Sequence, residues 1–112
     1  MNRPFRKPLV VIAPKKLLKL RDANSDLSEF ETGKSFVRVI PDQNPEVKPA
    51  TTRKVIFCSG QVYYDLIAER AKHGKKDIAI LRLEQLAPFP FTSFINELKK
   101  YPTAEIVWCQ EE

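Results

Sequence analysis

The sequence has no long apolar run and only one histidine, and each shortage excludes a class of protein. No stretch of its 112 residues approaches the roughly 20 apolar residues that a transmembrane helix needs. The apolar run 9–13 is also too short for the core of a signal peptide. His73 lies in a polar loop, without the support that a serine–histidine–acid triad requires. We therefore expect neither a membrane protein nor a hydrolase of the triad type.

Cysteine is equally scarce. Cys58 and Cys109 each lie within an apolar stretch, and the sequence contains no CxxC pair and no cluster of cysteine and histidine. Zinc sites need such clusters, and a disulfide needs a pairing that one sequence does not reveal. We therefore expect two buried, reduced thiols and no metal site.

Positive charge is in excess, but only near the start of the chain. The net charge is +5, yet residues 1–21 hold seven lysines and arginines and no acidic residue. Residues 22–52 are net acidic, and residues 53–112 are nearly balanced. A basic arm can bind nucleic acid through phosphate contacts, but only Phe5 is interleaved with these bases and no recognition motif is present. The pattern favours a solvated face or a site for a phosphate-bearing small molecule over nucleic acid.

Residues 1–52 contain six of the nine prolines and little sustained periodicity, which predicts short elements joined by loops. The expected elements are a buried strand over 9–13, a short basic helix over 15–21 with Pro14 in its first turn, a loop or single turn over 24–32, and a strand over 36–40 stopped by Pro41. Residues 41–52 (PDQNPEVKPATT) are then expected to form a linker.

Residues 53–112 are more regular, and apolar strands alternate with amphipathic helices. The spacing predicts strands over 55–58, 78–83 and 106–109, a helix over 62–72, and a second helix whose apolar face runs from Phe91 to Tyr101 before Pro102. This alternation predicts an α/β fold with a parallel sheet and right-handed crossovers.

Ligands of open parallel sheets bind at the carboxyl ends of the strands, which makes three short segments candidates for the wall of a crevice. They are Ser59-Gly60-Gln61, Glu84-Gln85 and Gln110-Glu111-Glu112. The helix that begins after Gly60 could hold an anion on its free N–H groups. Gly60 alone is not a GxGxxG motif, because Gln61 stands where a close pyrophosphate approach needs a second small residue, so the pattern disfavours NAD.

The acidic residues of these segments have two interpretations. Glu84, Glu111 and Glu112 could supply paired carboxylates for acid–base catalysis or for a metal. The sequence favours the other interpretation, in which they are solvated strand ends or interface residues. Taken alone, the residues indicate an α/β domain with a crevice and no assembled catalytic machinery.

Four stretches of the sequence resemble the C-terminal region of the 2-oxoglutarate dehydrogenase first component, a thiamine-diphosphate-dependent decarboxylase. They are RKPLVVIAPKKLL (6–18), VIFCSGQVYYDLIAER (55–70), ILRLEQLAPFPF (80–91) and YPTAEIVWCQEE (101–112). Their order and spacing match over nearly the whole chain, residues 22–52 excepted. The related 2-oxoadipate dehydrogenase component shares the pattern, but the unbroken VYYDL and WCQEE resemble the 2-oxoglutarate enzyme more closely.

The resemblance implies a much larger parent protein, of which this chain would be an inactive fragment. Residues 1–52 would be the end of the central transketolase-like domain and a linker. Residues 53–112 would be a truncated transketolase C-terminal domain, a Rossmann-like fold with a parallel sheet. In the family, thiamine diphosphate, magnesium and the catalytic histidines belong to upstream domains. The implied partners are those upstream domains, a homodimer partner and the lipoyl-bearing second component. The compartment would be the mitochondrial matrix in a eukaryote and the cytoplasm in a bacterium.

Some members of this family are regulated by acetyl-CoA or AMP near the junction of the central and C-terminal domains. Residues of this chain that could contact such an effector are Lys15, Lys16, Arg21 and Gln110. Two rival interpretations remain open at this point. One is a free-standing Rossmann-like module that binds a small ligand or nucleotide, and the other is a basic nucleic-acid-binding protein.

Overall fold

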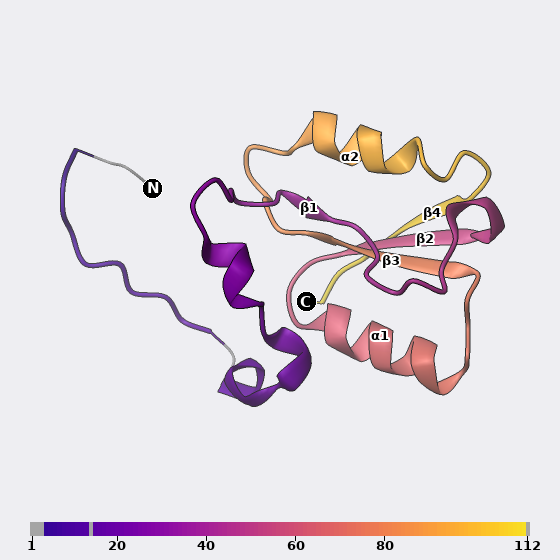
Figure 1. The fold of residues 1–112 in the computed structure, drawn as a ribbon, viewed down its shortest axis with the longest axis horizontal. Coiled ribbons are helices and arrows are strands. Elements are labelled where there is room, and N and C mark those ends of the chain that lie inside the picture. The colour runs from indigo at the N-terminus through magenta and orange to yellow at the C-terminus, as the bar shows by residue number, and fades with distance from the viewer. Residues whose placement is uncertain (1–3, 14, 112) are drawn as a thin grey trace. The chain divides into compact units, whose positions relative to one another are not determined.

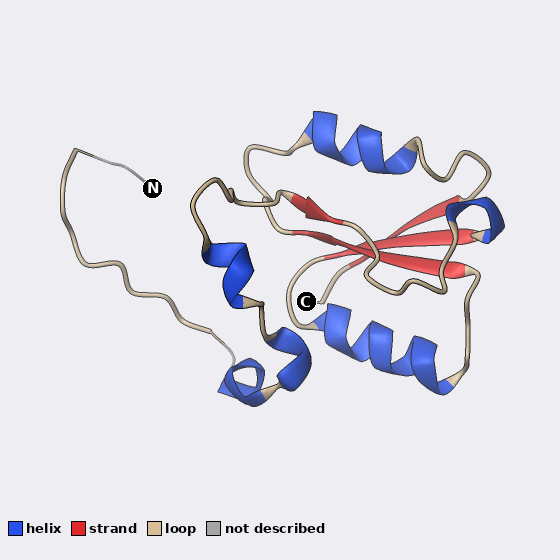
Figure 2. Cartoon of the chain, viewed as in Figure 1, coloured by secondary structure: helices blue, strands red, loops and turns tan. Residues whose placement is uncertain are grey.

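The computed structural model describes residues 4–13 and 15–111, and the chain divides into two compact units between Phe30 and Glu31 (Figures 1 and 2). The sequence prediction placed its boundary after residue 52 instead. Residues 31–52 therefore belong to the same compact unit as the regular region. The roles predicted for Pro14 and Glu112 lie outside the described residues.

The first unit contains three short 3₁₀ helices and no buried residue in any of them. They are η1 (Lys15–Lys19), η2 (Arg21–Ala23) and η3 (Leu27–Phe30). The predicted basic helix over 15–21 thus forms as two 3₁₀ turns, while η3 is the single turn expected within 24–32. A short α-helix draws most of its stability from a packed apolar face, and Leu18 is 81% exposed.

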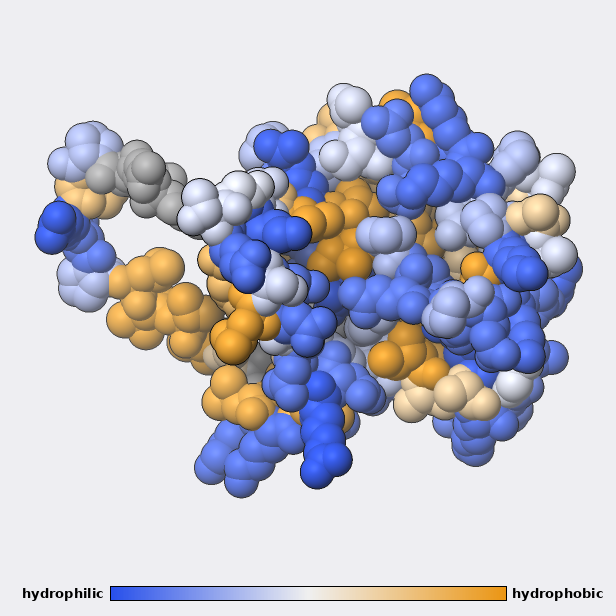
Figure 3. All heavy atoms as spheres, viewed as in Figure 1, coloured by the Kyte–Doolittle hydropathy of each residue, from blue (hydrophilic) through white to orange (hydrophobic). Residues whose placement is uncertain are grey.

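The prediction of a buried strand over 9–13 is wrong. These residues form no strand, and Leu9, Val10 and Ile12 are 81%, 84% and 97% exposed. Figure 3 shows hydrophobic residues on the surface of this segment. A strand needs a neighbour for its backbone N–H and C=O groups, and no described residue pairs with this segment in a sheet.

The second unit is built on a four-stranded sheet in the order β1-β3-β2-β4. The strands are β1 (Val39–Ile40), β2 (Lys54–Cys58), β3 (Ile78–Leu83) and β4 (Glu105–Cys109). β3, β2 and β4 are parallel to one another, which confirms the predicted parallel sheet. β1 adds an antiparallel edge beside β3 and is shorter than the strand predicted over 36–40, since Phe36 and Val37 are exposed.

Two helices cover opposite faces of this sheet (Figure 1). α1 (Val62–Lys72) connects β2 to β3, and α2 (Phe91–Leu98) leads from β3 past β2 to β4. The chain therefore reverses direction across the sheet after β3, and right-handed crossovers then require helices on both faces. Such a reversal creates a topological switch point at the carboxyl ends of β2 and β4.

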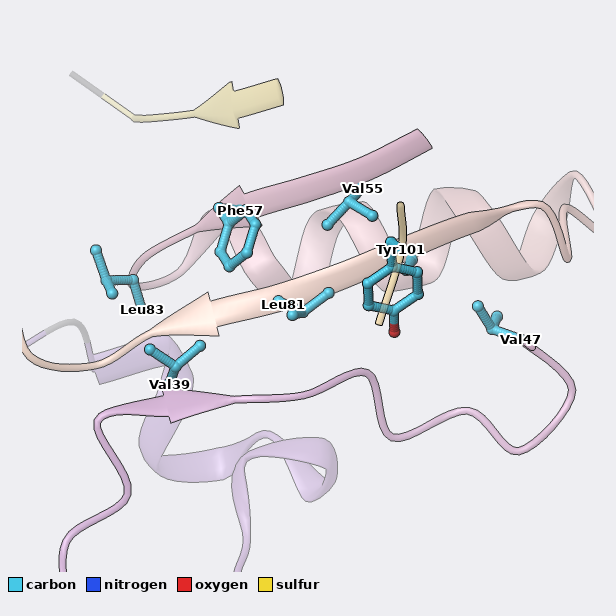
Figure 4. Close-up of a cluster of buried hydrophobic side chains, with 8 residues drawn as sticks. Val39, Val47, Val55, Phe57, Leu81, Leu83 and Tyr101 are labelled. Atoms are coloured by element: carbon cyan, nitrogen blue, oxygen red, sulfur yellow. The ribbon is translucent and has the colours of Figure 1, made fainter. Parts of the chain in front are cut away.

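Each face of the sheet has its own apolar cluster. The α2 face is lined by residues of β1, β2 and β3 together with Val47 and Tyr101 (Figure 4). Phe94 and Leu98 of α2 pack on them. On the α1 face, Cys58 and Ile80 contact Tyr63 of the helix. Successive residues of a strand point to opposite faces, so β2 serves both clusters.

The prediction of a linker over 41–52 is wrong, because this segment packs into the second unit. Val47 is 8% exposed and Thr52 is 3% exposed, and η4 (Pro49–Thr51) lies between them. The carboxylate of Asp42 forms an ion pair with Arg70 of α1 and accepts the backbone N–H of Ile80 in β3. Its polar, proline-rich composition concealed contacts with residues about 30 positions away in the sequence.

Within the described residues, no helix has both the length and the apolar character needed to cross a membrane.

Candidate functional site at the carboxyl edge of the sheet

The switch point brings together the segments that follow β2 and β4. The last pair in this parallel ladder is Cys58 with Cys109, so Ser59-Gly60-Gln61 and Gln110-Glu111 leave the sheet side by side. Ser59 and Gln61 are half-buried, whereas Gly60, Gln110 and Glu111 are exposed. Two of the three predicted segments therefore share one rim.

Gly60 makes the turn from β2 into α1 possible. Its φ of +72° lies in the left-handed region, which glycine adopts without steric cost. The carbonyl of Gly60 accepts the backbone N–H of Tyr63 at 3.4 Å. Asp65 is the acidic residue of the first helical turn, where a negative charge suits the helix dipole and repels an incoming anion. Anion binding at this turn remains a prediction.

Glu84 lies apart from the rim formed by β2 and β4. It follows β3, and β2 separates that strand from β4, so two strand spacings of about 4.8 Å lie between the ends that carry Glu84 and Glu111. Glu84 Oε1 is 3.5 Å from Nε of Arg82, and the backbone N–H of Glu84 donates to the carbonyl of Arg38. Across the described ranges, no three acidic, cysteine or histidine side chains are grouped as metal ligands would be.

Arg82 is a feature of this edge that the sequence analysis missed. Its guanidinium Cζ lies 4.6 Å from the ring centroid of Tyr63, and Nη1 donates to the hydroxyl of Tyr64 at 3.2 Å. Arg82 is also the register partner of Cys58 in β2. A single cation within the apolar strand ILRL was the signal that could have identified it.

The pKa of the Cys58 thiol is raised to about 11, mainly by burial and also by the nearby Cys109, whereas Arg82 opposes the shift. Burial also raises the pKa of the Tyr63 hydroxyl. Both groups are therefore neutral near pH 7, and the Glu84 carboxylate is the charged partner of Arg82 at this edge.

A second hollow, of about 300 Å³, opens beside the start of α2 and was also not predicted. Gln85 spans it, because its Oε1 accepts from Nε of Arg38 at 3.0 Å and its Nε2 donates to the carbonyl of Pro88 at 2.6 Å. Its lining residues are Arg38, Gln85, Phe89, Pro90, Phe91, Thr92 and Ser93. The hollow combines an exposed cation with aromatic side chains and hydroxyl groups.

The predicted effector contacts are divided between the two units. Lys15, Lys16 and Arg21 are exposed in the first unit. Gln110 belongs to the second unit, and its Oε1 accepts the indole N–H of Trp108 at 3.0 Å. Neither unit by itself assembles these four residues, so their shared role remains a prediction.

The fold defines the class of this protein as an α/β domain of Rossmann-like topology, with a mostly parallel sheet and a topological switch point between β2 and β4. The chain belongs to the family described as 2-oxoglutarate dehydrogenase C-terminal, whose model matches residues 24–112. The resemblance carried by the four sequence stretches is thereby confirmed.

Curated relatives match almost the entire chain. A Rattus norvegicus protein named "2-oxoglutarate dehydrogenase-like, mitochondrial" is 50% identical over 97% of this chain. "2-oxoglutarate dehydrogenase, mitochondrial" of Caenorhabditis elegans is 48% identical, and "2-oxoglutarate dehydrogenase E1 component" of Cupriavidus necator is 52% identical, both over 100% of the chain. The chain spans only 11–12% of the length of these three relatives.

Proposed function

We propose that this chain is part of the C-terminal domain of a 2-oxoglutarate dehydrogenase first component and that it serves domain packing and assembly there. The observation that carries the proposal is the combination of about 50% identity to enzymes of that name with coverage of only 11–12% of their length. The parent would decarboxylate 2-oxoglutarate and transfer the succinyl group to a lipoyl group on the second component. In a eukaryote it would work in the mitochondrial matrix, and in a bacterium in the cytoplasm.

The parent's cofactors, thiamine diphosphate and magnesium, do not fit the residues of this chain. Magnesium in a phosphate site is held by carboxylate oxygens together with the phosphates. Glu84 and Glu111 stand on strands that are not neighbours, and the described residues contain no larger group of ligand side chains. We therefore assign no step of the reaction to this chain and place the chemistry in the rest of the parent.

Exposed apolar side chains support a packing role. Leu9, Val10 and Ile12 are more than 80% exposed in the first unit. In the second unit, Ile106 and Trp108 of the edge strand β4 are 46% and 47% exposed. Large apolar side chains grouped on a surface mark protein interfaces, and an edge strand offers unpaired backbone groups as well. Further domains of the parent, or its homodimer partner, would cover these residues.

The absence of chemistry in this chain can be tested directly. We expect the 112-residue chain, given 2-oxoglutarate, thiamine diphosphate, magnesium and an artificial electron acceptor, to show the rate of the reagents alone. The full-length first component, assayed in parallel, serves as the positive control. Turnover that rises in proportion to the concentration of the chain would refute the proposal. Such turnover would mean that a site within residues 1–112 holds the cofactor and the substrate.

We further propose that the parent senses a phosphate-bearing effector, acetyl-CoA or AMP, and that Lys15, Lys16, Arg21 and Gln110 are each candidate contacts, to be tested one at a time. Lys15 and Arg21 are exposed cations, and cations form charge-assisted hydrogen bonds with phosphate. In the parent, Lys15→Ala, Arg21→Ala and Gln110→Ala are each expected to raise the effector concentration for half-maximal activation by about tenfold, which corresponds to about 1.4 kcal/mol. The measurement is an effector titration of the decarboxylation rate.

The matched control for this titration is Lys34→Ala, which removes an exposed cation outside the basic residues 1–21. It is expected to leave both the basal rate and the effector response unchanged. If all three test variants respond to acetyl-CoA and AMP like the unmodified parent, these residues do not contact the effector. A fall in basal rate without a change in the activation midpoint would likewise assign them a structural role.

A further inference from the structure

The two cysteines, 51 positions apart in the sequence, meet at the rim of the crevice. Cys58 and Cys109 are register partners at the ends of the neighbouring parallel strands β2 and β4. They also lie on the same face, because Cys109 packs against the cluster that contains Cys58, Tyr63 and Ile80. Neighbouring strands are about 4.8 Å apart, and disulfides join Cα atoms that are about 4.4–6.8 Å apart. The general spacing of neighbouring strands therefore falls within the Cα range of disulfides.

The surroundings give the two thiols different roles. Cys58 is 0% exposed, and its Sγ lies 3.6 Å from the carbonyl oxygen of Leu81, to which its S–H donates. Cys109 is only half-buried, at the exposed edge of the sheet. Oxidants reach exposed thiols first, so Cys109 is the thiol that reacts first with a peroxide. Cys58 lies beside it as its register partner on the neighbouring strand, where its sulfur can attack the oxidised Cys109.

We propose that Cys109 and Cys58 are a redox pair that closes to a disulfide in the presence of hydrogen peroxide. The Cys109 thiol loses its proton, its thiolate attacks one peroxide oxygen and the O–O bond breaks. The chain gains a sulfenic acid, and the displaced hydroxide takes up the released proton and leaves as water. The Cys58 sulfur then attacks the Cys109 sulfur, its proton leaves with the displaced hydroxide as a second water, and the S–S bond forms. Two thiols and one peroxide thereby yield one disulfide and two waters.

The charges around Cys58 determine how readily the second step proceeds. The thiolate is the attacking form, and burial keeps Cys58 mostly protonated by raising its pKa to about 11. Arg82 works in the opposite direction, because its positive charge favours the thiolate, whereas Glu84 disfavours it. Closure of the disulfide is therefore expected to be slower than the initial oxidation of Cys109.

A disulfide at this position would act directly on the candidate site. It would join β2 and β4 one residue before Ser59 and Gln110, which form the two sides of the rim. The residues after each strand would then be fixed relative to one another. The proposal does not depend on the parent activity, since it concerns only residues within the second unit.

The experiment treats the 112-residue chain with hydrogen peroxide, blocks the remaining thiols with iodoacetamide and digests the protein with trypsin. We expect mass spectrometry to find the peptides 55–70 and 101–112 joined, with the mass of the intact chain lower by two hydrogen atoms. Dithiothreitol should separate the peptides again. In Cys58→Ser, Cys109 should accumulate as a sulfenic acid that dimedone traps. In Cys109→Ser, Cys58 should remain a free thiol at the same peroxide dose.

Other results would overturn the proposal. In one such result, the chain without substitutions keeps both thiols reduced at the peroxide dose that oxidises Cys109 in the Cys58→Ser variant. Another is conversion of Cys109 to the sulfinic acid without linkage to the peptide 55–70. A third is a disulfide that appears only between two copies of the chain on a non-reducing gel. Circular dichroism of both serine variants confirms that each is folded before oxidation is compared.

Discussion

Replacing Asp42 with alanine is expected to lower the free energy of unfolding by about 3–5 kcal/mol, because it leaves a buried guanidinium without its counter-charge. The side chain of Asp42 is 4% exposed and that of Arg70 is 9% exposed. Asp42 Oδ1 accepts from Nη2 of Arg70 at 3.2 Å, while Oδ2 accepts the backbone N–H of Ile80 at 2.6 Å. Arg70 also donates to the carbonyl of Ile78 at 3.1 Å. One carboxylate therefore joins the segment after β1 to both α1 and β3.

Urea denaturation followed by circular dichroism measures this loss, and two variants serve as controls. Adding Arg70→Met to Asp42→Ala should recover part of the stability, because an apolar side chain can occupy the site without an unpaired charge. Glu46→Ala removes the exposed pair between Glu46 and Lys76 and should change stability by less than about 1 kcal/mol. If Asp42→Ala were no more destabilising than Glu46→Ala, the buried network would not hold residues 41–52 in place.

The elements that the sequence predicted correctly are those whose ends and apolar pattern are both set by nearby residues. The helix over 62–72 and the strand over 78–83 have the predicted bounds. Gly60 and Gly74, both with positive φ, bracket the helix, and an apolar run defines the strand. The crevice segments after β2 and β4 followed from the rule that parallel strands end at one edge.

The features that were missed depend on contacts between distant parts of the chain. Asp42 looks like an ordinary loop carboxylate until α1 brings Arg70 to it. The pairing of Cys58 with Cys109 depends on β4 lying beside β2, and strand order is set by the crossover of α2 over the sheet. For the segment 9–13 the error was a strand predicted where none forms. An apolar run favours a strand, but it does not supply a neighbouring strand to pair with.

Phe57→Ala is expected to destabilise the second unit by about 3–5 kcal/mol, through lost burial and the cavity left behind. Phe57 of β2 is 1% exposed, and its ring centroid lies 4.4 Å from that of Phe94 in α2. Figure 4 shows Phe57 in the layer that also contains Val55 and Leu81. Because this contact attaches α2 to the sheet, α2 and the β4 segment that follows it should lose order first. Urea unfolding gives the loss, and hydrogen exchange of the α2 amides reports its location.

A loss of this size approaches the total stability of a small domain, about 5–15 kcal/mol, so a graded variant keeps the prediction measurable. Phe57→Leu retains most of the apolar volume and should cost less than about 2 kcal/mol. Phe36→Ala is the matched control, since that ring is 67% exposed and its removal should change stability by no more than about 0.5 kcal/mol. Equal losses for Phe36→Ala and Phe57→Ala would contradict a core centred on β2. With the expected order of effects, the contact between Phe57 and Phe94 is what holds α2 on the sheet.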